Sequence, residues 1–177
     1  QLLTISRNLG DINSKRLKAI AKVESSGFGW KKDNRLKILF ERHIFYKLTT
    51  GSKDITNYCN PKAGGYDESN WEKFLAAIKA APVAAFQSIS MGAFQILGKW
   101  WDELGYGSPY SMALDLNKSQ YAQYVCLVNF IKNVADGVDE FLKISENPKD
   151  NIPFAKIYNG SDYDKNKYHI KLAEAMK

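Results

Sequence analysis

The amino-acid sequence predicts a mainly helical, α+β fold in which one small β or irregular insertion follows the first helix. Apolar residues recur at the helical spacing of three and four over much of the chain. One short apolar and aromatic run at 38–46 lacks a clear helical period, and a polar segment with strong turn signals follows at 49–70. At 177 residues we expect a single domain, 1–177, that buries about two-thirds of its unfolded surface.

The composition is typical of a globular protein, with 45% hydrophobic and 25% charged residues. A net charge of +6 and a pI near 9.2 favour acidic partners. Nucleic acid and the anionic groups of a bacterial cell wall are both candidates. Because the basic residues are mostly scattered and no nucleic-acid motif accompanies them, we expect most of them to be solvated surface.

No uncharged apolar run approaches the roughly 20 residues that span a bilayer, and no signal-peptide pattern opens the chain. We therefore expect no membrane insertion, and synthesis in the cytoplasm. The chain starts at Gln1, as a processed or excised piece of a longer protein would. Its two cysteines, Cys59 and Cys126, are too few for a disulfide framework or a metal site, and we interpret both as structural thiols.

The first predicted helix covers 13–25, with Asn13 or Ser14 as its cap. Its apolar stripe ends on a carboxylate, Glu24, and Gly27 then supplies a helix-stop signal. The stripe consists of Leu17, Ile20 and Ala21.

Glu24 therefore stands where a helix ends beside something open. Burial disfavours the charged form of a carboxyl group and raises its pKa. An acid that stays protonated near neutral pH is what general-acid catalysis needs. The structural alternative is a glutamate at a helix end that turns into water, and this stretch by itself leaves both interpretations open.

The middle of the chain predicts a mixed segment and then helices. Residues 38–46 are consistent with a buried strand that leads into a short helix, which periodicity alone does not settle. The turn-rich segment 49–70 predicts an ordered loop or a short hairpin. A helix with core-facing aromatic residues is expected from about Ser69 to Ile78, and Pro82 opens the next one.

The second half of the chain predicts further helices. Glycine and small residues at 88–98 break any simple period, whereas 100–104 look helical. Residues 117–120, Asn-Lys-Ser-Gln, resemble a capping box that would open the longest helix. Shorter helices are expected at 138–144, at 152–158 with Pro153 in the first turn, and at 166–176.

Metal and thiol chemistry have little support. His43 and His169 are far apart in the sequence and lack ligand partners at metal-site spacing, so we interpret each as a surface or satisfied core histidine. No metal or other cofactor is expected. Cys126 lies in the longest apolar helix, where a buried thiol is typical, and no histidine accompanies Cys59.

A carboxylate with polar neighbours that hold a sugar is the third possibility. Gln95 interrupts an apolar run and needs partners if it is buried. Tyr158 and Asn159 close a helix with donors and acceptors. Each has a structural alternative: a backbone partner for Gln95, a core position for Tyr158 and a cap for Asn159. Loop aromatics suited to stacking on sugar rings are Phe28, Trp30, Tyr66 and Tyr106.

Taken together and in order, three motifs resemble those of the lysozyme-like transglycosylase superfamily: Glu24-Ser25, 90–96 (SMGAFQI) and 158–160 (YNG). Their counterparts are a Glu-Ser helix end, Gly-Leu-Met-Gln-Ile and Ala-Tyr-Asn. Ile157 stands where the superfamily often has Ala, a difference of packing only. A closer resemblance, to the N-acetylmuramidase domain of phage endolysins and related bacterial proteins, covers nearly the whole chain. It is carried by 23–27 (VESSG), 38–45 (ILFERHIF), 64–66 (GGY), 87–92 (QSISMG), 104–106 (LGY), 130–131 (FI) and 158–160 (YNG).

The resemblance implies a lysozyme-like single domain with its small insertion beside the active-site cleft. It also implies cleavage of the β-1,4 bond between N-acetylmuramic acid and N-acetylglucosamine, with Glu24 as the general acid that protonates the leaving oxygen. The expected partner is the glycan strand of peptidoglycan, met in the periplasm or outside the cell by a monomer that needs no cofactor. The saccharide site would include Ser25, Tyr66, Phe94, Gln95, Tyr158 and Asn159.

The second carboxylate is less clear from the sequence. A retaining glycosidase needs one about 5 Å away, and an inverting one needs a base at roughly 6.5–9.5 Å. Glu41 is the first choice, because it stands in an otherwise apolar segment. Its structural alternative is an ion pair with Arg42 or a bond to the first helix. Asp54 and Asp67 are weaker candidates, and substrate-assisted chemistry would need no second carboxylate.

Three competing functions remain open. A lytic transglycosylase would use the same glutamate to close a 1,6-anhydro ring without water. A non-catalytic peptidoglycan-binding module would keep the fold and lose the glutamate, which is present here. A basic helical nucleic-acid-binding domain is suggested by charge alone and predicts salt-sensitive DNA binding.

Overall fold

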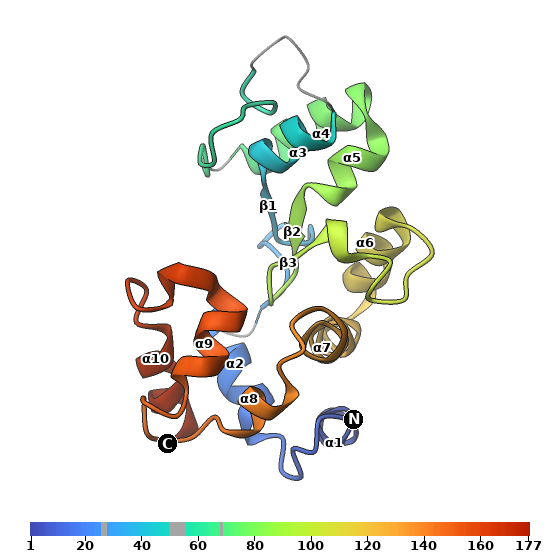
Figure 1. Ribbon diagram of the computed structural model, residues 1–177. Coiled ribbons are helices and arrows are strands. Elements are labelled where there is room, and N and C mark those ends of the chain that lie inside the picture. The colour runs from blue at the N-terminus through green and yellow to red at the C-terminus, as the bar shows by residue number, and fades with distance from the viewer. Residues whose placement is uncertain (26–27, 50–55, 68) are drawn as a thin grey trace. The chain divides into compact units, whose positions relative to one another are not determined.

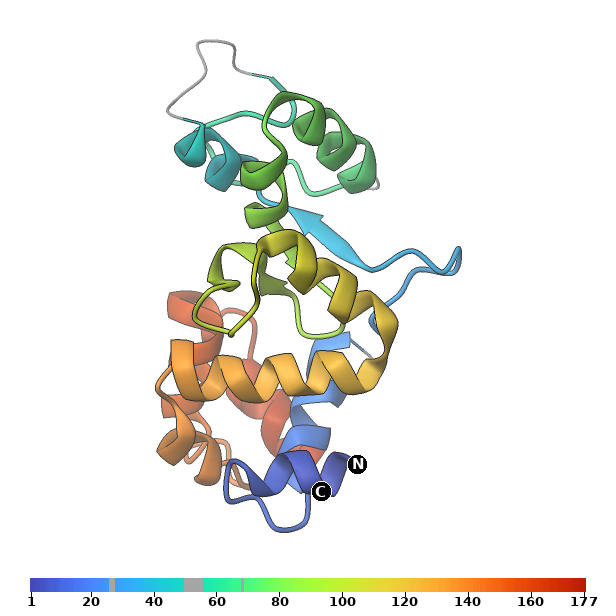
Figure 2. The ribbon, with the colours of Figure 1, turned by 90° about the vertical axis from the view of Figure 1, so that its right-hand side faces the viewer.

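The computed structural model describes residues 1–25, 28–49, 56–67 and 69–177 (Figures 1 and 2). The chain forms two compact units: Gln1–Phe28 with Tyr121–Lys177, and Gly29–Gln120. We call them unit 1 and unit 2. The described residues of unit 1 form helices and connecting loops without a strand, and unit 2 combines helices with a small sheet. The predicted class, mainly helical with a small β part, is confirmed.

Unit 1 contains the predicted first helix, α2 (Lys15–Ser25), and the last helix, α10 (Tyr168–Met176), which pack side by side. Their contact is apolar because Leu17 and Ile20 of α2, like Leu172 of α10, are fully buried. The remaining helices of unit 1 are α1 (Leu2–Arg7), α7 (Gln120–Asn129), the π-helix η2 (Phe130–Val134), α8 (Val138–Leu142), α9 (Ile152–Asn159) and the 3₁₀ helix η3 (Gly160–Tyr163).

Local chemistry explains where α9 begins and ends. Pro153 lies in its first turn, where a missing N–H costs nothing. Gly160 ends the helix with φ +67°, a backbone conformation that favours glycine. Phe154 of α9 is fully buried against Phe141 of α8, with ring centroids 6.1 Å apart. The segment that carries Tyr158 and Asn159 is therefore anchored in the core of unit 1.

Unit 2 is built on a three-stranded antiparallel sheet with the order β1-β2-β3. The strands are β1 (Ile38–Phe40), β2 (Ile89–Met91) and β3 (Ile96–Leu97), with Leu39 opposite Ser90 and Met91 opposite Ile96. All three residues of β2 are buried, as expected for a central strand. The helices are α3 (Arg42–Leu48), α4 (Asn70–Ala80), α5 (Pro82–Gln87), the 3₁₀ helix η1 (Gly98–Trp100) and α6 (Pro109–Lys118).

Several elements follow the sequence predictions. The strand that leads into a short helix at 38–46 is confirmed by β1 and α3, and Pro82 occupies the first turn of α5. The described parts of the 49–70 segment are irregular, without a strand.

Residues 89–97, for which no regular element was predicted, form a β-hairpin. Two other predictions are wrong. After η1 the 101–105 segment consists of turns rather than helix. The capping box expected at 117–120 lies instead at Ser108–Ser111, where the two side chains bond each other's backbone N–H. Asn117 is still inside α6, and its Oδ1 accepts a hydrogen bond from Trp30 Nε1 at 3.2 Å.

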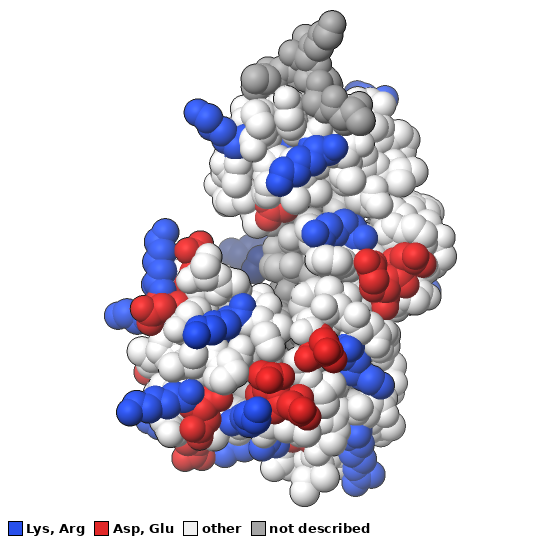
Figure 3. Space-filling model, in the orientation of Figure 1, with Lys and Arg blue, Asp and Glu red and all other residues white. Residues whose placement is uncertain are grey.

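None of the described helices is long and apolar enough to cross a membrane. On the face drawn in Figure 3, blue basic and red acidic side chains are interspersed. The described residues of that face show no continuous basic stripe of the kind that tracks a nucleic-acid backbone. This distribution agrees with the interpretation of most basic residues as solvated surface.

Candidate active site

Glu24 lies in the last turn of α2, on the helix face whose apolar residues are buried. Its side chain is partly exposed. Two tyrosines of unit 1, Tyr158 and Tyr168, lie close enough for the charge of Glu24 to raise their pKa values. The predicted carboxylate therefore sits at a helix end, within the electrostatic reach of two phenol groups.

The two tyrosines form a stack. Their ring centroids are 5.8 Å apart with planes inclined by 17°, and the ring of Phe154 stacks on Tyr158 at 5.5 Å. Burial is the main cause that raises the pKa of both tyrosines well above 10, and the charge of Glu24 adds to it. For Tyr168, the neighbouring Glu24 side chain contributes in the same direction, while the buried Tyr168 hydroxyl makes no hydrogen bond to the described residues. Both phenols therefore stay protonated and can donate at neutral pH.

A π-helix supports this stack. Phe130, the first residue of η2, packs edge-on against Tyr158 with ring centroids 6.0 Å apart. A π turn inside an α-helix is uncommon and is frequent at functional sites. Asn159 follows Tyr158 as the last residue of α9 and is half-buried. The structural alternative for Asn159 was a helix cap. No side-chain hydrogen bond of Asn159 is described at that helix end.

Unit 2 carries the second predicted carboxylate, Glu41, at the start of α3. Its Oε2 accepts a 2.6 Å hydrogen bond from the hydroxyl of Tyr66 and lies 3.4 Å from His43 Nδ1. The Glu41 side chain is 15% exposed. The carboxylate is thus largely enclosed, and a donor orients one of its oxygens.

Among the described residues, the expected alternative for Glu41, an ion pair with Arg42, is wrong. The basic side chain near the Glu41 carboxylate is the imidazole of His43, which is charged only when protonated. Arg42 instead donates to the backbone, from Nε to the carbonyl of Lys62 at 2.9 Å and from Nη2 to the carbonyl of Ala63 at 3.4 Å. The guanidinium therefore holds the loop that brings Tyr66 to Glu41.

The loop around Tyr66 contains two groups whose pKa values are strongly shifted. Partial burial raises the pKa of Tyr66 to about 12, with the hydrogen bond to Glu41 as the next cause. Hydrogen bonds from Lys73 and then Ser69 lower the pKa of Asp67 to about 2. Asp67 is occupied by these partners, which argues for a structural role over its weaker candidacy as the second carboxylate.

Gln95 stands in the turn between β2 and β3 with φ +50°, a strained conformation for a residue with a Cβ. Its Nε2 donates to the carbonyl of Gly92 at 2.9 Å, so the backbone partner that was its structural alternative is present. The side chain is nevertheless half-buried rather than enclosed. Neighbouring Phe94 is only 3% exposed and belongs to the core of unit 2.

The predicted site residues thus fall into two groups. Glu24, Tyr158 and Asn159 belong to unit 1, whereas Glu41, Tyr66, Phe94 and Gln95 belong to unit 2. The side chain of Ser25 and all of Asp54 lie outside the described residues. Sequence reasoning missed Tyr168, which reaches Glu24 from another helix, and Lys73, whose buried position has no local signal. His43 was considered only as a metal ligand or a surface or core residue.

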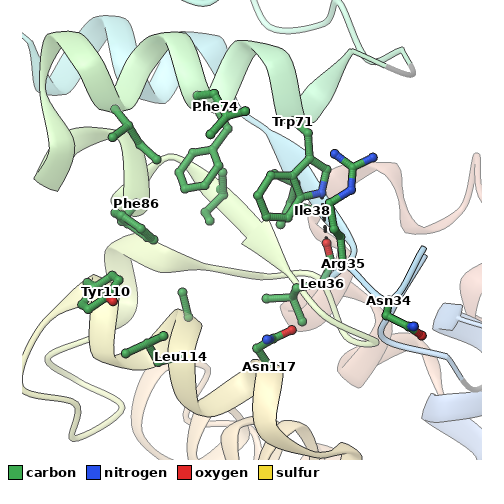
Figure 4. A pocket seen from close by; sticks show the side chains of 14 residues that line it. Asn34, Arg35, Leu36, Ile38, Trp71, Phe74, Phe86, Tyr110, Leu114 and Asn117 are labelled. Atoms are coloured by element: carbon green, nitrogen blue, oxygen red, sulfur yellow. Dashed lines mark hydrogen bonds between the residues drawn. The ribbon is translucent and has the colours of Figure 1, made fainter. Parts of the chain in front are cut away.

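Within the described residues, no cluster of histidine, cysteine and carboxylate side chains could hold a metal ion. Unit 2 also has an apolar groove of about 400 Å³, shown in Figure 4. Two of its polar side chains have partners: Trp71 Nε1 donates to the Leu36 carbonyl at 3.2 Å, and Arg35 pairs with Asp33. The described residues that line the groove include no carboxylate or histidine. The aromatic residues that line it are Trp71, Phe74, Phe86 and Tyr110.

Comparison with known proteins finds a family model and a solved structure that match the chain. A family model described as N-acetylmuramidase matches residues 13–177. A solved structure, the endolysin of Burkholderia phage AP3, matches with a TM-score of 0.87 and 29% sequence identity. The match covers 99% of the present chain and 67% of the endolysin chain. A search of curated proteins found no match.

Proposed function

The chain belongs to the N-acetylmuramidase family, and we propose that it is a peptidoglycan hydrolase that cleaves the β-1,4 bond between N-acetylmuramic acid and N-acetylglucosamine. The likeness to a phage endolysin supports action on the bacterial cell wall. The partner is the glycan strand, and the enzyme acts as a monomer without a metal or other cofactor.

Glu24 is the general acid in this proposal, and it donates its proton to the leaving glycosidic oxygen. The observation that carries the assignment is the position of Glu24 at the end of α2, partly exposed and near the Tyr158–Tyr168 stack. The exposed part can meet a substrate, while the phenols provide polar surroundings for the carboxyl group. A positioned acid of this kind contributes roughly 10²–10⁴-fold to the rate.

Glu41 is the proposed second carboxylate. The Tyr66 hydroxyl fixes one oxygen of Glu41, which leaves the ionised group to accept a proton from water or to stabilise developing positive charge on the sugar. Saccharide contacts are proposed for Ser25, Tyr66, Gln95, Tyr158 and Asn159, whereas Phe94, also predicted from the sequence, is enclosed in the core of unit 2 and does not reach a sugar. Of these, Gln95 and Asn159 present half-buried amide groups suited to hydroxyl and acetamide recognition.

The test compares wild type with Glu24→Gln on purified peptidoglycan, with mass spectrometry of the released muropeptides. The substitution preserves shape and removes the proton donor. The matched control is Glu174→Gln, the same chemical change at an exposed position of α10, the helix that packs against α2. We expect reducing-end fragments from wild type and the control, and almost none from Glu24→Gln.

Other results would select a different function. Fragments with 1,6-anhydromuramic ends from wild type indicate a lytic transglycosylase. Sedimentation with peptidoglycan without any released fragment indicates a non-catalytic binding module. Equal cleavage by wild type and Glu24→Gln would show that the chemistry lies elsewhere in the chain.

A further inference from the structure

Lys73 is a buried lysine outside the residues proposed to touch substrate. It lies in α4 and is 6% exposed, a position that lysine almost never takes unless it is paired. Its Nζ donates to Asp67 Oδ1 at 2.7 Å and to the backbone carbonyl of Gly65. One buried cation therefore has two acceptors on the same loop.

The two acceptors of Lys73 flank Tyr66 in the sequence, one on each side. The ammonium group thus closes a bridge across the backbone that carries Tyr66. On the far side, the hydroxyl of Tyr66 reaches Glu41 Oε2 at 2.6 Å. Because Tyr66 is 49% exposed, packing alone holds its ring loosely, and the bridge fixes the backbone from which the ring projects.

A neighbouring residue ties the same loop to the strand before Glu41. Asn70 Nδ2 donates to the Asp67 carbonyl at 2.6 Å, and Asn70 Oδ1 accepts from the backbone N–H of Phe40 at 3.0 Å. Phe40 is the last residue of β1 and immediately precedes Glu41. Asn70 therefore links the loop that carries Tyr66 to the backbone that carries Glu41.

Arg42 holds the opposite side of this loop through the carbonyls of Lys62 and Ala63. Its guanidinium lies so close to Gly65 that an added Cβ would be 2.9 Å from Nη1. Gly65 also has φ +72°, which favours glycine. Two cations, Arg42 and Lys73, thus clamp a loop whose tip carries Tyr66.

We propose that Lys73 is a positioning residue that fixes Tyr66 through Gly65 and Asp67, so that the Tyr66 hydroxyl orients the Glu41 carboxylate. Its effect on catalysis rests on the role proposed above for Glu41, whereas its effect on Tyr66 does not. The pKa values of Asp67 and Tyr66 agree with these contacts. The hydrogen bond from Lys73 is the main cause of the low pKa of Asp67, and the hydrogen bond to Glu41 is the second cause, after burial, of the high pKa of Tyr66.

The first experiment follows the ionisation of Tyr66 by NMR of protein labelled at the tyrosine ring Cζ, with the signal assigned by Tyr66→Phe. In wild type Tyr66 titrates with a pKa of about 12. In Lys73→Met we expect this pKa to fall toward the ordinary value near 10, because the hydroxyl no longer stays on Glu41. Lys73→Arg keeps a cation with several donors and should retain most of the shift.

Two further variants separate positioning from loss of fold. Lys79→Met makes the same change at an exposed position of α4 and should leave the Tyr66 titration unchanged. Asp67→Asn removes the charge of the acceptor, whose side chain is 58% exposed, but keeps an amide oxygen for Lys73, and should lower the Tyr66 pKa. A Tyr66 pKa that stays near 12 in both Lys73→Met and Asp67→Asn overturns the proposal.

The second experiment is a double-mutant cycle on peptidoglycan cleavage with Lys73→Met and Tyr66→Phe. We expect Lys73→Met to lower kcat about tenfold in wild type, and hardly at all in the Tyr66→Phe background. Independent, additive losses of kcat overturn the proposal, because a merely structural lysine would act in both backgrounds. If wild type cleaves nothing, the proposed function fails, and the Tyr66 titration still decides the role of Lys73.

Discussion

Tyr158 and Tyr168 stack with their ring centroids 5.8 Å apart, although they belong to two different helices, α9 and α10. Phe154 extends the stack by one ring from the preceding turn of α9. The stack is anchored in the core of unit 1, because Phe154 is fully buried. The phenol groups of Tyr158 and Tyr168 lie close enough to Glu24 for its charge to raise their pKa values. A packed aromatic column thus holds two protonated hydroxyls beside the proposed acid.

The first prediction concerns the hydroxyl of Tyr168. Tyr168→Phe keeps the ring stack and removes the polar hydroxyl that lies near Glu24, so we expect the fold to be retained and kcat/KM to fall about tenfold. Less polar surroundings disfavour the charged form of a carboxyl group. The general acid then stays protonated to higher pH, and the alkaline limb of the pH–rate profile should move upward.

The measurement for Tyr168 is kcat/KM on soluble peptidoglycan fragments as a function of pH. Tyr163→Phe, at a partly exposed position of η3, is the control and should follow wild type. A Tyr168→Phe profile that coincides with wild type would mean that the hydroxyl does not act on Glu24 during the reaction.

Sequence reasoning predicted best what local chemistry decides. The helix α2 follows from its apolar stripe, and α9 from Pro153 and Gly160, signals that lie within the element itself. The position of Tyr168 near Glu24 was harder to predict, because Tyr168 is far from Glu24 in sequence and carries no periodic signal. The Glu41–Tyr66 bond also spans 25 positions through an irregular loop, and no spacing rule predicts such a contact.

The missed hairpin has a different cause. Its strands β2 and β3 have three and two residues, too short for an alternating pattern to be recognised. The turn between them places Gly92 and Gln95 at positive φ, and glutamine is not a residue that normally marks such a position. The irregular composition was visible in the sequence, but tertiary burial of all of β2 decided the structure.

The second prediction concerns Gln95. Alanine at φ +50° keeps the strain that glycine relieves, so Gln95→Gly should be more stable to unfolding than Gln95→Ala by about 1 kcal/mol. Both variants lose the amide, and both should lose activity about equally. Urea unfolding measures the first difference, and muropeptide release measures the second. Equal stability of the two would contradict strain at this position, while full activity would remove Gln95 from the saccharide site.

The third prediction concerns the close approach at Gly98, the first residue of η1. A Cβ there would lie 2.1 Å from the backbone oxygen of Phe86, which cannot swing away as a side chain can. We expect Gly98→Ala to destabilise the protein by about 3 kcal/mol, at the upper end for overpacking. Gly107→Ala is the control, since nothing lies within 4 Å of its added Cβ. The midpoints of urea unfolding compare the two, and a Gly98→Ala midpoint equal to that of Gly107→Ala would contradict the predicted clash.

The fourth prediction uses the high pKa of Tyr66. In the native protein this phenol keeps its proton up to about pH 12, whereas the unfolded chain loses it near 10. Between these values the native state binds more protons, so the free energy of unfolding falls as the pH rises through this window. Tyr66→Phe removes this contribution, and its loss of stability from pH 10 upward should be shallower than that of wild type. Parallel curves in urea unfolding would contradict the shift.

The last prediction uses the opposite shift, at Asp67. Its native pKa of about 2 lies below the ordinary value of 3.8, so in acid the unfolded chain binds a proton that the native protein does not. The stabilisation is therefore complete above about pH 4 and is lost as the pH falls toward 2. Asp67→Asn cannot titrate and should show a shallower acid loss of the free energy of unfolding in that window. Asp164→Asn, at a carboxylate that is 78% exposed, is the matched control and should follow the wild-type slope. If Asp67→Asn keeps that slope too, the bonds from Lys73 and Ser69 do not hold Asp67 ionised in solution.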